Sequence, residues 1–268
     1  MSGAAGRNGP LALAFNAAVI CFMLAPLVIV CVVAFTPHNT LTIPTTSFSL
    51  RWFRAVFAHP DFMQSFWNSV ALATASATIA TALAIPAGLA ITRYEFPGRD
   101  FLNGLFLSPL LIPHLVLGVA MLRMFALIGA TGSFFWLTLA HVVVVTPYAM
   151  RLVIAAVVGF DRSAEQAAAS LGASSNTVFR RITLPMILPG VTGGWLLSFI
   201  NSFDEVTMSI FVTAPSTVTL PVRMYMYATE SIDPLMAAVS ALMVGLTGVA
   251  MLLLDRVYGL DKILVGHK

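Results

Sequence analysis

The chain contains 268 residues, of which 59% are hydrophobic and only 9% are charged. Soluble domains carry charged residues at about a quarter of their positions, so this composition excludes a soluble protein and predicts an integral membrane protein. The formal net charge of +3 is too small to indicate binding to nucleic acid. The two cysteines, Cys21 and Cys31, share one apolar segment and lack the spacing of metal ligands.

Apolar runs of roughly 20 residues, the length that crosses a hydrocarbon core of about 30 Å, indicate the membrane spans. The first run is too long for the core of a secretory signal, so we expect it to remain as a transmembrane helix. No internal repeat and no linker divides the chain. We therefore predict an all-α integral membrane protein, one domain over residues 1–268 with six transmembrane helices. The predicted spans are 11–35, 66–91, 101–128, 133–156, 189–212 and 234–256.

The distribution of Lys and Arg gives the orientation, because cytoplasmic loops carry an excess of these residues. With both termini inside, only Arg51, Arg54, Arg123 and Arg223 fall near the outer face. We therefore place both termini and the segment 160–187 in the cytoplasm. The expected cytoplasmic cations are Arg7, Arg93, Arg99, Arg151, Arg162, Arg180, Arg181, Arg256, Lys262 and Lys268.

The longest polar interruption is EQAAASLGASSNTVFRRITLP, residues 165–185. Ser163 and Gln166 have the spacing of a capping box, which predicts a helix start, and the alanines that follow favour helix. Gly172 is suited to close that helix in the left-handed conformation. One of the two serines after it begins a second short helix, which we expect Pro185 to end. The sequence thus predicts a cytoplasmic helix, a glycine turn and a helix between spans four and five. A simple return loop is the alternative.

From Gln166 the order is Gln, Ala, Ala, three residues, Gly172, nine residues, Ile, one residue, Leu and Pro185. This order resembles the loop of ATP-binding-cassette (ABC) importer permeases, E-A-A-x3-G-x9-I-x-L-P. This sequence departs from the motif at its first position, where Gln166 replaces the usual glutamate. Glu165, one residue earlier, points about 100° away around the helix and cannot take the place of that glutamate without a rotation of the helix. The resemblance implies that this loop is bound by an ATPase subunit. Its candidate coupling residues are Glu165, Gln166, Ala167, Ala168, Gly172, Ile182, Leu184 and Pro185.

The resemblance extends over residues 45–230. The stretches SLRWF, LSPLLIPHLVLGVAMLRMF, DRSAEQAAASLGA and SFDEVTMSIFVTAPSTVTLPVRMY are similar to permeases of the spermidine/putrescine type. That family implies a multi-pass protein of the bacterial inner membrane. Its implied partners are a second permease subunit, with a heterodimer expected, two cytoplasmic ATPase subunits, a periplasmic substrate-binding protein and membrane lipid. The chain has no phosphate loop of the form GxxxxGK[ST], so ATP and Mg²⁺ are expected on the ATPase subunits and no cofactor on this chain.

Asp204 and Glu205 lie within the predicted fifth span, about 15 residues or roughly 22 Å from its start. An ionisable residue at such depth indicates a functional site. Carboxylates along an aqueous path attract cations, so these residues are the first candidates for contact with an amine. The alternative is that one carboxylate is bonded to a neighbouring helix. A three-and-four spacing predicts one polar stripe of Ser198, Asn201, Ser202, Glu205 and Ser209.

His114 follows Pro113 in the predicted third span, where prolines interrupt the helical hydrogen bonds. We expect a packing role, with a substrate contact as the alternative. The polyamine permeases carry an acidic residue there, so this departure keeps less cationic amines and amino-acid derivatives open. Trp52 in the external loop is expected to anchor that loop at the membrane interface. The alternative is a contact with the binding protein at the entrance of the substrate pathway.

The function predicted from the sequence is therefore a permease subunit of an ABC importer that moves a small cationic or amine solute into the cytoplasm. It is not itself an enzyme. One alternative is a proton-coupled secondary transporter that uses Asp204 and Glu205, with His114 in the relay. An intramembrane enzyme is a further alternative, but the sequence contains no GxSxG or HExxH motif. The histidines are scattered, so no metal site is expected.

Overall fold

The computed structural model describes residues 9–44 and 47–258, with side chains up to residue 249. Within these ranges every regular element is a helix, which confirms the all-α prediction. The chain divides into two compact units. The first unit contains the described residues up to Pro60 together with residues 226–253, and the second contains residues 61–225 with the end of the last helix. Three of the expected cytoplasmic cations, Arg7, Lys262 and Lys268, lie outside the described residues.

The first unit is built from α1 (Pro10–Val33), α2 (Arg51–Ala58) and most of α12 (Pro234–Tyr258). Helix α1 exposes its apolar side chains, and only 6% of its apolar window is buried. Such a surface is stable only against lipid or another protein. Helix α2 lies in the loop that was predicted to be external, and its Trp52 and Val56 are buried.

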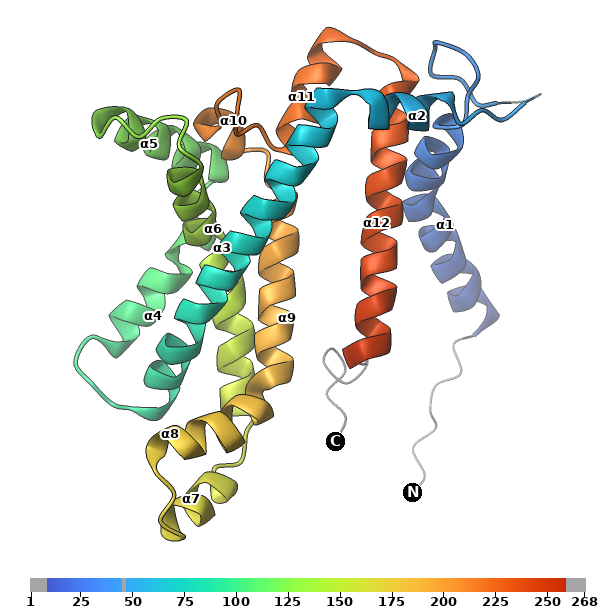
Figure 1. Ribbon diagram of the computed structural model, residues 1–268. Helices are drawn as coiled ribbons and strands as arrows, with labels where there is room; N and C mark the ends of the chain where they lie inside the picture. The colour runs from blue at the N-terminus through green and yellow to red at the C-terminus, as the bar shows by residue number, and fades with distance from the viewer. Residues whose placement is uncertain (1–8, 45–46, 259–268) are drawn as a thin grey trace. The chain divides into compact units, whose positions relative to one another are not determined.

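The second unit contains the helices that carry both candidate sites. A 3₁₀ turn, η1, follows α4, and a π turn, η2, joins α8 to α9. In Figure 1, α7 and α8 lie together at one end of α6 and α9. The elements are α3 (Pro60–Arg93), α4 (Arg99–Leu107), η1 (Ser108–Leu111), α5 (His114–Leu127), α6 (Phe134–Val158), α7 (Ser163–Ser170), α8 (Ser175–Val178), η2 (Phe179–Thr183), α9 (Leu184–Phe203), α10 (Ser209–Val212) and the first half of α11 (Leu220–Glu230), whose second half belongs to the first unit.

Helix α6 is the centre of this second unit, with 56% of its apolar window buried. Its closest neighbour is α9, and the two helices meet at small residues. At Gly194 of α9 a Cβ atom would lie 3.2 Å from the Ala149 carbonyl oxygen of α6. Small residues allow membrane helices to approach backbone to backbone, which raises their dispersion contact. This packing holds the start of α9, and with it the α7–α8 loop, against α6.

Four helices among the described residues are long and apolar enough to cross a membrane: α1, α3, α6 and the helix over Ser175–Phe203. A fifth span is counted if α4 with η1 and α5 are one broken span. The span predicted over 101–128 is not one continuous helix: the chain bends by 104° between η1 and α5, in the region where prolines were expected to interrupt the helical hydrogen bonds. Pro113 has ψ of 128°, outside the helical range, and provides no N–H for a helical bond. Within the part of α12 whose side chains the structure describes, Pro234–Val249 forms an apolar stretch, and the helix itself continues to Tyr258.

The predicted helix over 189–212 also differs from the structure. The helix continues unbroken from Ser175 and ends at Phe203, and the chain then unwinds before α10. The Glu205 carboxylate accepts a hydrogen bond from the Met208 N–H at 2.7 Å. Such a local side-chain bond offers the backbone an alternative to the helix. Asp204 and Glu205 therefore follow the end of α9 and are not inside it.

Candidate functional site

Helix α7 begins at Ser163, as predicted, but without the predicted capping box. Asp161 fixes the start: its carboxylate accepts hydrogen bonds from the Ser163 N–H at 3.0 Å and from the Ser163 hydroxyl at 2.7 Å. Bonds to the charged form stabilise it, and they lower the pKa of Asp161. The Gln166 N–H donates to the Arg162 carbonyl and not to the Ser163 hydroxyl. The nearby carboxylate takes the place that the Gln166 amide was expected to fill.

Gly172 ends α7 in the left-handed conformation, with φ of +86°, as predicted. Its N–H and that of Ala173 donate to the carbonyls of Ala169 and Ala168, which closes the last turn. Ser174 then caps α8 by accepting from the Thr177 N–H. The predicted helix, glycine turn and helix are therefore confirmed.

Pro185 does not end the second helix, which corrects the prediction. In the π turn η2, the Leu184 N–H donates to the Phe179 carbonyl, five residues earlier. This wider spacing absorbs the missing N–H of the proline that follows, so the helix continues into α9. Ile182 and Leu184 are half-buried in this turn, and Pro185 is exposed.

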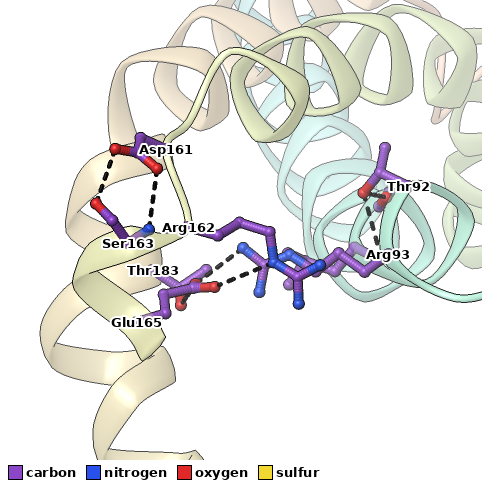
Figure 2. A network of polar contacts seen from close by, with 9 residues as sticks. Thr92, Arg93, Asp161, Arg162, Ser163, Glu165 and Thr183 are labelled. Atoms are coloured by element: carbon purple, nitrogen blue, oxygen red, sulfur yellow. Dashed lines mark hydrogen bonds and ion pairs between the residues drawn. The ribbon is translucent and has the colours of Figure 1, made fainter. Parts of the chain in front are cut away.

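Glu165 is the centre of a polar network that joins three segments (Figure 2). Its Oε1 atom accepts from the Arg93 guanidinium at 2.8 Å and from the Thr183 hydroxyl. The Arg93 and Glu165 side chains are only 15% and 9% exposed. Arg162 lies 4.0 Å from the other carboxylate oxygen, but it is 58% exposed, and such surface pairs contribute little.

The other coupling candidates of α7 face outward. Gln166 and Ala167 are exposed and Ala168 is half-buried. Beside the network is a hollow of about 360 Å³, whose wall includes Gln166 and the three residues of the network. Leu171, at the tip of the loop, is 89% exposed. We did not single it out, although an apolar residue at an exposed turn is the signal that would have identified it.

Glu205 and His114, distant in sequence, are in contact. The Glu205 Oε2 atom lies 2.6 Å from Nδ1 of His114, the first residue of α5. With the Met208 bond to Oε1, both oxygens of this buried carboxylate are occupied. The predicted alternative, a carboxylate bonded to a neighbouring helix, therefore describes Glu205 in this structure. Asp204 is exposed beside it.

The predicted polar stripe is divided by the end of α9. Ser202 and Ser209 lie on different helices, but the ring of His141 in α6 bridges their hydroxyls at 2.8 and 3.0 Å. His141 is completely buried, and it was not singled out from the sequence. Asn201 donates to the Leu197 carbonyl of its own helix.

Trp52 belongs to the first unit, where its indole N–H donates to the His38 carbonyl at 3.2 Å and the Arg51 guanidinium lies over its ring. The side chain is thus held inside its own loop. Among the described residues, no three His, Cys, Asp or Glu side chains are grouped as metal ligands.

Residues 80–260 match the family described as binding-protein-dependent transport system inner membrane component. The chain is 30% identical over 248 residues to the spermidine/putrescine transport system permease protein PotC of Escherichia coli strain K12, covering 92% of this chain and 93% of the relative. It is 32% identical over 234 residues to the PotC protein of Haemophilus influenzae, covering 87% and 91%.

The fold is also similar to that of a solved bacterial alginate ABC transporter in complex with an alginate pentasaccharide-bound periplasmic protein. The TM-score is 0.71 at 16% identity, and 93% of this chain and 95% of that chain are covered. At this identity the likeness concerns the fold alone. The family match covers more than half of the chain, and the relatives match nearly all of it. The chain therefore belongs to the family of binding-protein-dependent transport system inner membrane components, as the multi-pass permease subunit of an ABC importer whose ATP is hydrolysed by other subunits.

Proposed function

We propose that this permease carries a small cationic amine of the polyamine type, such as putrescine or spermidine, from the periplasm to the cytoplasm. The observation that carries the proposal is the 30% identity to a spermidine/putrescine permease over 92% of the chain. Asp204 supports it, because an exposed carboxylate next to a break between membrane helices favours a cation.

The proposed assembly contains a second, different permease subunit, two cytoplasmic ATPases and a periplasmic binding protein. In this assembly the chain crosses the inner membrane six times, with both termini in the cytoplasm. Helix α12 supplies the sixth span, and the broken pair of α4 and α5 supplies the third. The excess of Lys and Arg in the loops assigned to the cytoplasm supports this orientation.

Coupling is proposed to run through α7 and α8. The exposed side of α7 carries Ala167 and Gln166, and small side chains allow a partner to approach the helix closely. Closure of the ATPases around ATP would move this loop and change the access of the membrane helices. The proton-driven alternative is not retained, because the family takes its energy from a separate ATPase.

The substrate proposal is tested by uptake in cells that lack their own polyamine transport. The chain is expressed with its companion permease, ATPase and binding protein, and uptake of labelled putrescine, spermidine, a monovalent amine, arginine and alanine is compared. We expect uptake of a polyamine, abolished by an ATPase variant that cannot hydrolyse ATP. The Asp204→Asn variant should reduce uptake of the polyamine more than that of a monovalent amine. Uptake of amino acids without polyamines would refute the substrate, and uptake that persists with the inactive ATPase would refute the coupling.

A further inference from the structure

We infer that Arg93, Glu165 and Thr183 form a cytoplasmic tie that positions the coupling helix α7, so that its movement reaches the membrane helices. The inference rests on the proposed coupling through α7 and α8. It assigns a role to Arg93, which lies outside the coupling motif, and to Thr183, which occupies the unspecified position between Ile182 and Leu184. It also gives the candidate coupling residue Glu165 a specific structural task.

The tie brings three distant segments to one oxygen atom. Arg93 is the last residue of α3, Thr183 is the last residue of the π turn before α9, and Glu165 is the third residue of α7. Both donors bond to Oε1 of Glu165 (Figure 2). Two membrane helices are therefore attached to the coupling helix through a single carboxylate.

Helix α7 has little else to hold it. Within Ser163–Ser170, Glu165 is the one buried residue. The hollow of about 360 Å³ lies beside the tie, where an apolar core would otherwise fix the helix. Apart from its packing against α8 and η2, the position and tilt of α7 therefore depend on the polar contacts of Glu165. Without those contacts, this eight-residue helix would be less firmly attached to the membrane helices.

The chemistry of the tie suits the transmission of movement. An arginine and a carboxylate that share a charge-assisted bond form a stronger contact than two neutral groups. Removal of one partner leaves the other as an unpaired charge at a largely buried position, which is strongly unfavourable. The three segments are thus expected to move together.

Two neighbouring residues of α7 have different roles: one is bonded within the tie, and the next is available to the ATPase. Glu165 points inward to the tie, and Gln166, one position later, is exposed. A glutamine at the outward position leaves the tie intact, because the tie uses only the preceding glutamate. The two positions can therefore be tested separately.

The test compares uptake with ATP hydrolysis in the assembled transporter, reconstituted with its binding protein. Glu165→Gln and Arg93→Gln are expected to assemble and hydrolyse ATP, but to lower the ratio of solute moved to ATP hydrolysed by about tenfold. The matched control is Arg162→Gln, which removes the exposed arginine near the same carboxylate and should change this ratio by less than about twofold.

The exchange of charges, Arg93→Glu with Glu165→Arg, provides the decisive readout. It restores a pair between the same two segments, so we expect it to recover most of the lost ratio. A ratio unchanged in the single variants would overturn the tie, as would a double variant that assembles but is no better than either single one. Single variants that fail to assemble also overturn it if the double variant fails to assemble. A wild-type complex that hydrolyses no ATP in response to the binding protein would instead refute the proposed function.

Discussion

The packing of α6 against α9 can be tested with single methyl groups. A Cβ atom added at Gly190 would overlap the Ala156 methyl group and lie 2.8 Å from the Leu152 carbonyl oxygen, a backbone atom that cannot turn aside. At Gly194 the nearest atom, the Ala149 carbonyl oxygen, would be 3.2 Å away. The two helices therefore have to separate for Gly190→Ala and only to adjust slightly for Gly194→Ala.

The size of the effect follows from two opposing contributions. Overpacking costs about 1–3 kcal/mol, whereas replacing glycine by alanine in a helix stabilises it by about 0.5–1 kcal/mol. We expect Gly190→Ala to be destabilising by about 1–2 kcal/mol and Gly194→Ala to be nearly neutral. The control is Gly104→Ala in α4, where the added Cβ would have nothing within 4 Å, and this variant should be equally or more stable than the wild type.

The measurement is the midpoint of thermal unfolding of the purified chain in detergent. At about 2–4 °C per kcal/mol for a chain of this size, the Gly190→Ala variant should melt a few degrees lower than the wild type. The melting point is expected to be highest for Gly104→Ala, intermediate for Gly194→Ala and lowest for Gly190→Ala. If Gly190→Ala melts as high as Gly104→Ala, the close approach of α6 and α9 is wrong.

Three further substitutions address the loop and the buried carboxylate. Gly172→Val should abolish uptake without affecting membrane insertion, because φ of +86° is strained for valine. The control Gly98→Val has the same strain, at φ of +85°, but lies outside the coupling loop and should retain uptake. Equal losses of uptake in the two variants would refute a specific role of Gly172 in coupling. Leu171→Asp should weaken co-purification of the ATPase, because this exposed side chain is available to a partner. Leu171→Met keeps an apolar side chain and should not weaken it. Normal co-purification of the aspartate variant would exclude Leu171 from the interface with the ATPase. Glu205→Ala leaves the buried Met208 N–H without its acceptor, which should cost about 1–3 kcal/mol of stability. Glu205→Gln keeps an acceptor oxygen, so its melting temperature should fall less. Equal melting temperatures of the two variants would contradict the bond between Glu205 and the Met208 N–H.

The sequence alone determined what depends on composition and local chemistry. An all-helical membrane protein follows from 59% hydrophobic residues, since an uninterrupted helix satisfies its own backbone in lipid. The turn at Gly172 follows from the left-handed conformation that glycine adopts at low cost. The spacing from Gln166 to Pro185 indicated the family, because each position in that motif is fixed locally along the chain.

Tertiary structure decided which distant residues meet. Nothing in the sequence around Arg93 indicates Thr183 as its neighbour at the Glu165 carboxylate, because that contact depends on how three helix ends are packed. The bond between His114 and Glu205 has the same origin. Because of it, Glu205, which was predicted to line the substrate pathway, is instead paired with a neighbouring helix. Local patterns also misjudged Pro185, whose missing N–H is absorbed by a π turn instead of ending the helix. Periodicity along one helix gives the direction of a side chain, but its partner is set by the neighbouring helices.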